Sequence, residues 1–123
     1  MKLTENNELV MDSLNYMNFT SDSSAKDYKK SLDTCREIIK KIYDVDYKDY
    51  HNIGIKSYNR MHMECRNIYL YTSCFIMGIS IDVLSELENI SVTDITKIIK
   101  SINNRKSFED RQLFSKIFNH IKN

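Results

Sequence analysis

The stretch from Asn67 to Ile81 contains no charged side chain, although charged residues make up 28% of the chain. A helix that is apolar on all sides must be surrounded by protein or by lipid. A membrane-spanning helix needs about 20 predominantly apolar residues, whereas this stretch is shorter and is interrupted by tyrosine, threonine and serine. We therefore expect a buried central helix and no membrane span. The residues that we expect to pack in the core are Cys74, Phe75, Met77, Gly78 and Ile81.

The composition predicts an all-α fold. Proline is absent and the two glycines are Gly54 and Gly78, whereas strand-and-turn architectures need frequent Gly, Pro, Asn-Gly or Asp-Gly turns. A chain of 123 residues is usually one domain and can remove roughly two-thirds of its unfolded surface from water. We expect residues 1–123 to form a single helical domain. Gly78 is expected in mid-helix, at a close contact with a neighbouring helix.

Apolar side chains recur at helical spacing before the central stretch. The spacing predicts amphipathic helices over about residues 4–18 and from Lys26 to Tyr43, and a loop or one short helical turn over residues 44–52. Either one long helix then covers about residues 56–85, or two helices meet near Arg66.

Two capping boxes follow the central stretch. Glu86 and Glu88 are expected to return the chain to solvent. Ser91 then precedes Asp94 by three residues, and Ser107 precedes Asp110 by three. In a capping box, the first side chain bonds a free N–H group of the first helical turn. Each pair is followed by an apolar periodicity of helical type, so two amphipathic helices are predicted to close the chain.

No residue pattern indicates catalysis or a metal. His62 and Cys65 share a helical face, but a zinc site needs four ligands in paired spacings and no second pair is present. A reactive thiol needs an electropositive, partly exposed setting, whereas Cys35 and Cys74 lie in apolar patterns. Glycine is too scarce for a phosphate-binding loop. We expect neither an enzyme nor a cofactor.

Charge and cysteine usage indicate a cytoplasmic protein. The formal net charge of +1 gives no general attraction to nucleic acid or anionic lipid. The cations of the last third are assigned to the solvent sides of helices, and the alternative, nucleic-acid binding, predicts an affinity that falls steeply with salt. The three cysteines are odd in number and widely spaced, which favours a reducing compartment. The first residues lack the apolar stretch of a signal peptide.

Tyrosine is unusually frequent, with eight residues in the chain. Half of them lie in or beside the acidic connection over residues 44–52, and tyrosine is enriched at protein interfaces because its ring is large and stiff. The alternative is an AT-rich coding sequence, which raises tyrosine content everywhere. The interface hypothesis names Tyr43, Tyr47, Tyr50 and Tyr58.

The segment TSCFIMGISIDVLSEL, followed by ITKIIKSINN and QLFSKIFNHIKN, is similar to the C-terminal half of the poxvirus Bcl-2-like proteins. The earlier stretch LDTCREIIKKIYDVDYKDY resembles the second helix of that family, so the similar parts cover about residues 28–123. Many family members carry a tryptophan after the central helix, and this chain has none. The Asn-Trp-Gly-Arg motif of the cellular Bcl-2 groove is also absent, so no family contact residue is assigned.

The resemblance implies a Bcl-2-like bundle of six or seven helices around the central apolar helix. It also implies a non-catalytic virulence factor in the host cytoplasm. Such a protein would bind host signalling or apoptotic proteins, inhibit innate immune signalling (including NF-κB activation) or apoptosis, and in several cases form a homodimer. The alternative is a small bacterial or phage-encoded helical antagonist, an immunity or inhibitor protein that binds a toxin or nuclease.

Overall fold

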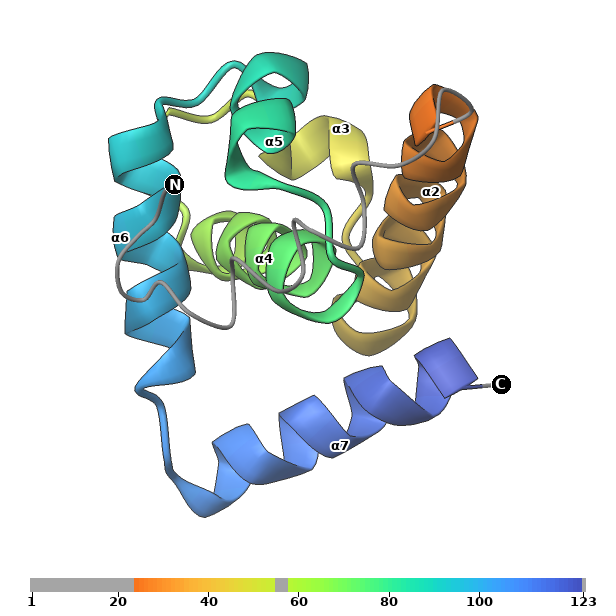
Figure 1. The fold of residues 1–123 in the computed structure, drawn as a ribbon. Helices are drawn as coiled ribbons and strands as arrows, with labels where there is room; N and C mark the ends of the chain where they lie inside the picture. The colour runs from red at the N-terminus through yellow and green to blue at the C-terminus, as the bar shows by residue number, and fades with distance from the viewer. Residues whose placement is uncertain (1–23, 55–57, 123) are drawn as a thin grey trace.

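The protein is all-helical in the computed structural model, which describes residues 24–54 and 58–122 (Figure 1). The expected helix over residues 4–18 lies outside the described residues. The all-α prediction is confirmed. The elements are α2 (Ser24–Tyr43), α3 (Tyr47–Tyr50), α4 (Arg60–Tyr71), the π-helical turn η1 (Thr72–Ile76), α5 (Ile81–Glu88), α6 (Val92–Asn103) and α7 (Phe108–Lys122).

Helix α4 and the turn η1 lie at the centre of the described part of the molecule (Figure 1). Helices α2, α3 and α6 pack against α4, and α7 runs along one end of the bundle, where it contacts α2. Ile68, Tyr69 and Leu70 of α4 are almost completely buried. The uncharged stretch therefore supplies the centre of the core, as its composition predicts.

The amphipathic helices turn their apolar stripes toward this centre. Helix α2 buries Leu32, Cys35 and Ile39, and α6 buries Ile95, Ile99 and Ile102 at helical spacing. Burial of this kind contributes roughly 25 cal/mol per Å² of apolar surface removed from water. No helix within residues 24–54 and 58–122 has the length and apolarity that a membrane crossing requires.

Helix α4 begins directly after its N-cap residue, Asn59. The side chain of Asn59 accepts a hydrogen bond of 2.9 Å from the backbone N–H of His62, which satisfies one of the free donors of the first turn. Helix α4 continues through Arg66, so two helices do not meet there. A separate helix, α5, begins at Ile81, so one helix does not cover residues 56–85 either. Both sequence predictions are therefore wrong.

The central helical segment ends with η1 at Ile76, so Gly78 lies just beyond it and not in mid-helix as expected. After the wider turn of η1, Gly78 adopts φ +80°, a left-handed conformation that side chains other than glycine rarely take. This conformation directs the N–H groups of Gly78 and Ile79 back to the carbonyls of Cys74 and Ser73, in the manner of a glycine-capped helix end. Gly78 thus separates α4 and η1 from α5.

Both capping boxes are present at the predicted positions. The hydroxyl of Ser91 accepts a hydrogen bond of 3.1 Å from the N–H of Asp94 at the start of α6. At the start of α7 the exchange is reciprocal, because Ser107 Oγ accepts from the N–H of Asp110 and Asp110 Oδ2 accepts from the N–H of Ser107. The two closing helices therefore start where the sequence predicts.

The residues expected in the core from the uncharged stretch divide into two groups. Cys74 and Gly78 are buried. Phe75, Met77 and Ile81 are partly buried and pack against the core.

Candidate protein-binding groove

A groove of about 470 Å³ lies between α2 and α5. Its volume falls within the range of about 300–1,000 Å³ that is typical of ligand sites. Most of its walls are apolar, with three charged side chains among them. The lining residues are Tyr28, Lys29, Leu32, Arg36, Val83, Leu87 and Glu88.

Helical spacing builds each wall. Tyr28, Leu32 and Arg36 follow one another at steps of four along α2, so they share one face of the helix. Val83 and Leu87 do the same on α5. Leu87 is 54% exposed. The α5 wall of the groove is therefore apolar and open to solvent.

The caps of α5 fix the position of that wall. Ser80 accepts a hydrogen bond of 3.3 Å from the N–H of Val83 at the start of the helix. Asn89 ends the helix with φ 56°, a left-handed conformation that asparagine tolerates better than most residues. Helix α5 has only eight residues. Val83, Leu87 and Glu88 therefore all lie within a few residues of one of its two caps.

The end of the groove is a buried carboxylate. The side chain of Glu88 is only 4% exposed. Tyr47 donates a hydrogen bond of 2.8 Å to Glu88 Oε1, and Tyr69 donates one of 2.7 Å to Oε2. A guanidinium nitrogen of Arg36 lies 3.8 Å from Oε2. Four helices meet at this carboxylate, and these contacts offset the free-energy cost of burying its charge. We call Glu88 and its three partners, Tyr47, Tyr69 and Arg36, the Glu88 cluster.

Arg36 lines the groove beside this carboxylate. Its guanidinium carbon is 3.7 Å from the centre of the Tyr47 ring, a cation–π geometry. Its other ion-pair partner is Asp33, at 3.4 Å and half-exposed. Arg36 Nε is buried and makes no hydrogen bond with any of the described residues. The groove thus borders a cation that is about one-third exposed, although its Nε atom is buried.

The two tyrosines keep their protons at neutral pH. Burial, together with the hydrogen bond and charge of Glu88, raises the pKa of Tyr47 to about 12. Burial and Glu88 also hold the pKa of Tyr69 well above its usual value. Both phenols are therefore available as donors to the carboxylate over the physiological range.

The four tyrosines of the interface hypothesis occupy different environments. Tyr50 is completely buried, and Tyr47 belongs to the Glu88 cluster. Tyr43 is partly buried and donates a hydrogen bond of 2.8 Å to Glu64. Tyr58 exposes its whole side chain to solvent. Tyr43, Tyr47 and Tyr50 thus make contacts within the chain, and Tyr50 offers no surface to a partner. The interface role stays a prediction for Tyr43, Tyr47 and Tyr58, which keep surface exposed to solvent.

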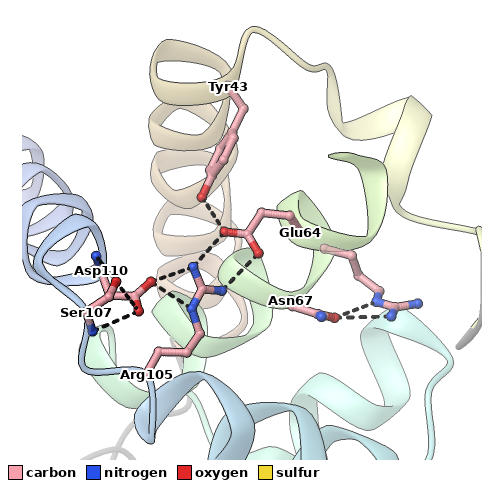
Figure 2. A network of polar contacts seen from close by, with 7 residues as sticks. Tyr43, Glu64, Asn67, Arg105, Ser107 and Asp110 are labelled. Atoms are coloured by element: carbon pink, nitrogen blue, oxygen red, sulfur yellow. Dashed lines mark hydrogen bonds and ion pairs between the residues drawn. The ribbon is translucent and has the colours of Figure 1, made fainter. Parts of the chain in front are cut away.

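A second polar network joins three parts of the fold (Figure 2). Arg105 donates two hydrogen bonds to the Glu64 carboxylate, at 2.9 and 3.0 Å, and one of 2.9 Å to Asp110. Glu64 also accepts from Tyr43 of α2. Bidentate arginine–carboxylate pairs are directional. We call these residues the Glu64–Arg105 clamp; it ties α2 and α4 to the connection between α6 and α7.

The three cysteines lie in the interior of the described structure. Cys35, Cys65 and Cys74 are buried, and burial raises their thiol pKa values to about 11, about 12 and about 12, respectively. Such thiols are poor nucleophiles at neutral pH. Within the part of the chain that the structure describes, no cluster of three or more His, Cys, Asp or Glu side chains could hold a metal ion.

Sequence reasoning did not find the groove. Glu88 was expected to face solvent, and its burial depends on two tyrosines that lie 41 and 19 residues away. A signal for each wall was present, namely the four-residue steps of Tyr28, Leu32 and Arg36 and of Val83 and Leu87. Nothing in those steps indicates that the two helices meet. Comparison of the chain with protein-family models, curated proteins and solved structures finds no match.

Proposed function

We propose that this chain is a viral interaction protein that inhibits host innate immune signalling or apoptosis by binding a host protein in the groove between α2 and α5. It acts without catalysis, in the cytoplasm of the host cell. The observation that carries the binding role is the groove itself. Leu32, Val83 and Leu87 line a concave, mostly apolar site with a few charged groups at its walls, and binding sites are typically built in this way.

Two further features support a binding role. The α5 wall stands on a helix with a cap at each end, and contacts around Glu88 join it to α2. A rigid site loses less conformational entropy when a partner binds. The buried thiols and the raised thiol pKa values do not favour covalent chemistry. The choice of a host signalling or apoptotic protein as partner rests on the resemblance to the poxvirus Bcl-2-like family, and a fold alone does not define a function.

The test uses two matched variants. Leu87→Ser removes an exposed apolar side chain from the groove, and Val92→Ser removes one from the first turn of α6, outside the groove. Val92 is 42% exposed, so both changes are expected to alter stability by less than about 1 kcal/mol. Thermal unfolding of both proteins checks this before any cell experiment.

Both variants and the wild type are then expressed in cells that carry an NF-κB reporter and receive an apoptotic stimulus. We expect the wild type and Val92→Ser to lower at least one response, and Leu87→Ser to lose most of that effect. If folded wild-type protein changes neither response, the viral function is wrong, and the bacterial or phage antagonist becomes the better hypothesis. If Leu87→Ser is as active as the wild type, the groove is the wrong site.

A homodimer is part of the same proposal, because apolar surface on a bundle of this size is often covered by a second copy. Sedimentation equilibrium at high micromolar concentration measures it directly. A monomeric mass would contradict the homodimer but would not contradict partner binding in the groove.

A further inference from the structure

We infer that the segment bound in the groove is an acidic amphipathic helix or strand, whose carboxylate pairs with Arg36 while its apolar side chains lie between Leu32, Val83 and Leu87. This inference rests on the proposed function, because it specifies the chemistry of the partner at the same groove. It is carried by the two cations that line the α2 wall, the exposed Lys29 and the partly exposed Arg36.

The negative charge of the groove is already engaged. Both oxygens of Glu88 accept hydrogen bonds from tyrosine hydroxyls. The side chain is almost entirely buried, so it presents little surface to a ligand. A cationic partner would therefore meet a carboxylate whose acceptors are occupied and which already has Arg36 beside it.

The positive charge is not fully engaged. Arg36 reaches Glu88 and Asp33 only at 3.8 and 3.4 Å, distances longer than those of a well-formed charge-assisted hydrogen bond. Asp33 is half-exposed, so water weakens that attraction. The side chain of Arg36 is 31% exposed and lines the groove. A ligand carboxylate can therefore approach the guanidinium from the groove and form a closer ion pair than Glu88 and Asp33 do.

A second cation lies along the same groove. Lys29 also lines it, and it precedes Arg36 by seven residues, or two helical turns, with Leu32 between them. The α2 wall thus presents two cations about 10 Å apart with an apolar side chain between them. An amphipathic segment with apolar residues flanked by acidic ones is complementary to this pattern.

A polypeptide fits the groove better than a small anion does. A small carboxylate could reach Arg36 but would leave Leu87, half-exposed on the opposite wall, in water. A segment that carries an aliphatic side chain next to its carboxylate covers Leu87 and pairs with Arg36 at once. Removal of that apolar surface from water adds to the affinity.

The experiment selects binders without naming them in advance. A library of displayed 16-residue peptides is panned on the folded full chain, and the enriched peptides are sequenced and synthesised with a fluorescent label. Methyl NMR of the bound chain then locates each peptide. Binders that shift the methyl signals of Leu32, Val83 and Leu87 occupy the groove, and binders that shift other signals do not.

Each groove binder is then tested in a double-mutant cycle. Its acidic form and its amide form are each measured against the wild type and against Arg36→Gln. Changing its acidic residue to the matching amide is expected to weaken binding to the wild type at least about tenfold, the usual effect of losing a hydrogen bond to a charged group. The same change should have little effect on Arg36→Gln. Arg111→Gln, which removes an exposed cation of α7, is the control and should behave as the wild type. Lys29→Gln, an exposed change, keeps the test usable if Arg36→Gln unfolds, and should reduce the amide effect.

The outcomes separate the two claims. Peptides that occupy the groove but bind equally well as acid and amide, or a set enriched in lysine and arginine, overturn the acidic partner and leave the proposed function standing. Binders that all lie outside the groove, or no binder at all, contradict both. Displacement of every peptide by dodecanoate at equal affinity would assign the groove to small amphiphiles instead of polypeptides.

Discussion

The Glu88 cluster makes the most quantitative prediction. In Glu88→Gln one acceptor oxygen remains, but an amide N–H₂ group replaces the other oxygen, so one of the hydroxyls of Tyr47 and Tyr69 loses its acceptor. A hydrogen bond to a charged group contributes about 1.5–3 kcal/mol to stability. The variant also removes the negative charge 3.8 Å from Arg36. We expect the free energy of unfolding to fall by about 2–3 kcal/mol.

The assay is thermal and urea unfolding followed by circular dichroism at pH 7. For a domain of this size, 1 kcal/mol corresponds to roughly 4 °C in the unfolding midpoint, so the expected decrease is about 8–12 °C. Glu86→Gln is the matched control, because Glu86 is an exposed residue of the same helix, and its midpoint should move by no more than about 2 °C. Equal midpoints for Glu88→Gln and Glu86→Gln would refute the buried carboxylate.

The same cluster predicts a pH dependence. The pKa of Tyr47 rises from 10.0 to about 12 on folding, so the folded state holds this proton more tightly than the unfolded state. The resulting stabilisation is fully present below pH 10 and is lost as the pH rises toward 12. In Glu88→Gln the negative charge that helps to raise the pKa is gone, so its stability should fall less steeply above pH 10. Parallel alkaline unfolding curves for the two proteins would contradict this explanation.

Three further predictions concern other parts of the fold. Gly78→Ala should lower the stability by about 1–2 kcal/mol in urea unfolding, since Gly78 has φ +80° and alanine is strained there; an unchanged midpoint would mean that α4 continues through residue 78. Arg105→Gln breaks the Glu64–Arg105 clamp and should speed amide exchange in α7 more than in α2; a uniform change would deny the clamp its role. The buried thiols should react with a disulfide reagent such as dithionitrobenzoate only as fast as the chain unfolds; rapid labelling of the native protein would show an accessible cysteine.

The parts of the fold that local chemistry controls were predictable. The capping boxes at Ser91 and Ser107 are local because each bond joins residues three apart. The burial of the uncharged stretch follows from composition, since an apolar helix has no face to turn to water. These signals placed α6, α7 and the core of α4 close to where the structure has them.

The parts that depend on distant contacts were not predictable. Gly78 was expected in mid-helix, but it has a positive φ and lies in the connection between η1 and α5. Tyr50 sits in an acidic, polar segment, and its burial requires α4 to lie beneath α3. Glu88 has the charge of a surface residue, and only the meeting of Tyr47, Tyr69 and Arg36 makes its burial tolerable. Sequence periodicity describes one helix at a time, so it does not predict a groove that forms between two helices.

The central claim is that α4 and η1 form the buried axis on which α2 and α5 are held to make the groove. Amide hydrogen exchange of the native chain, measured residue by residue, tests it most directly. Slowest exchange, at the rate of global unfolding, is expected for Ile68 to Leu70. Exchange there as fast as at the exposed end of α7 would contradict the fold and, with it, the groove.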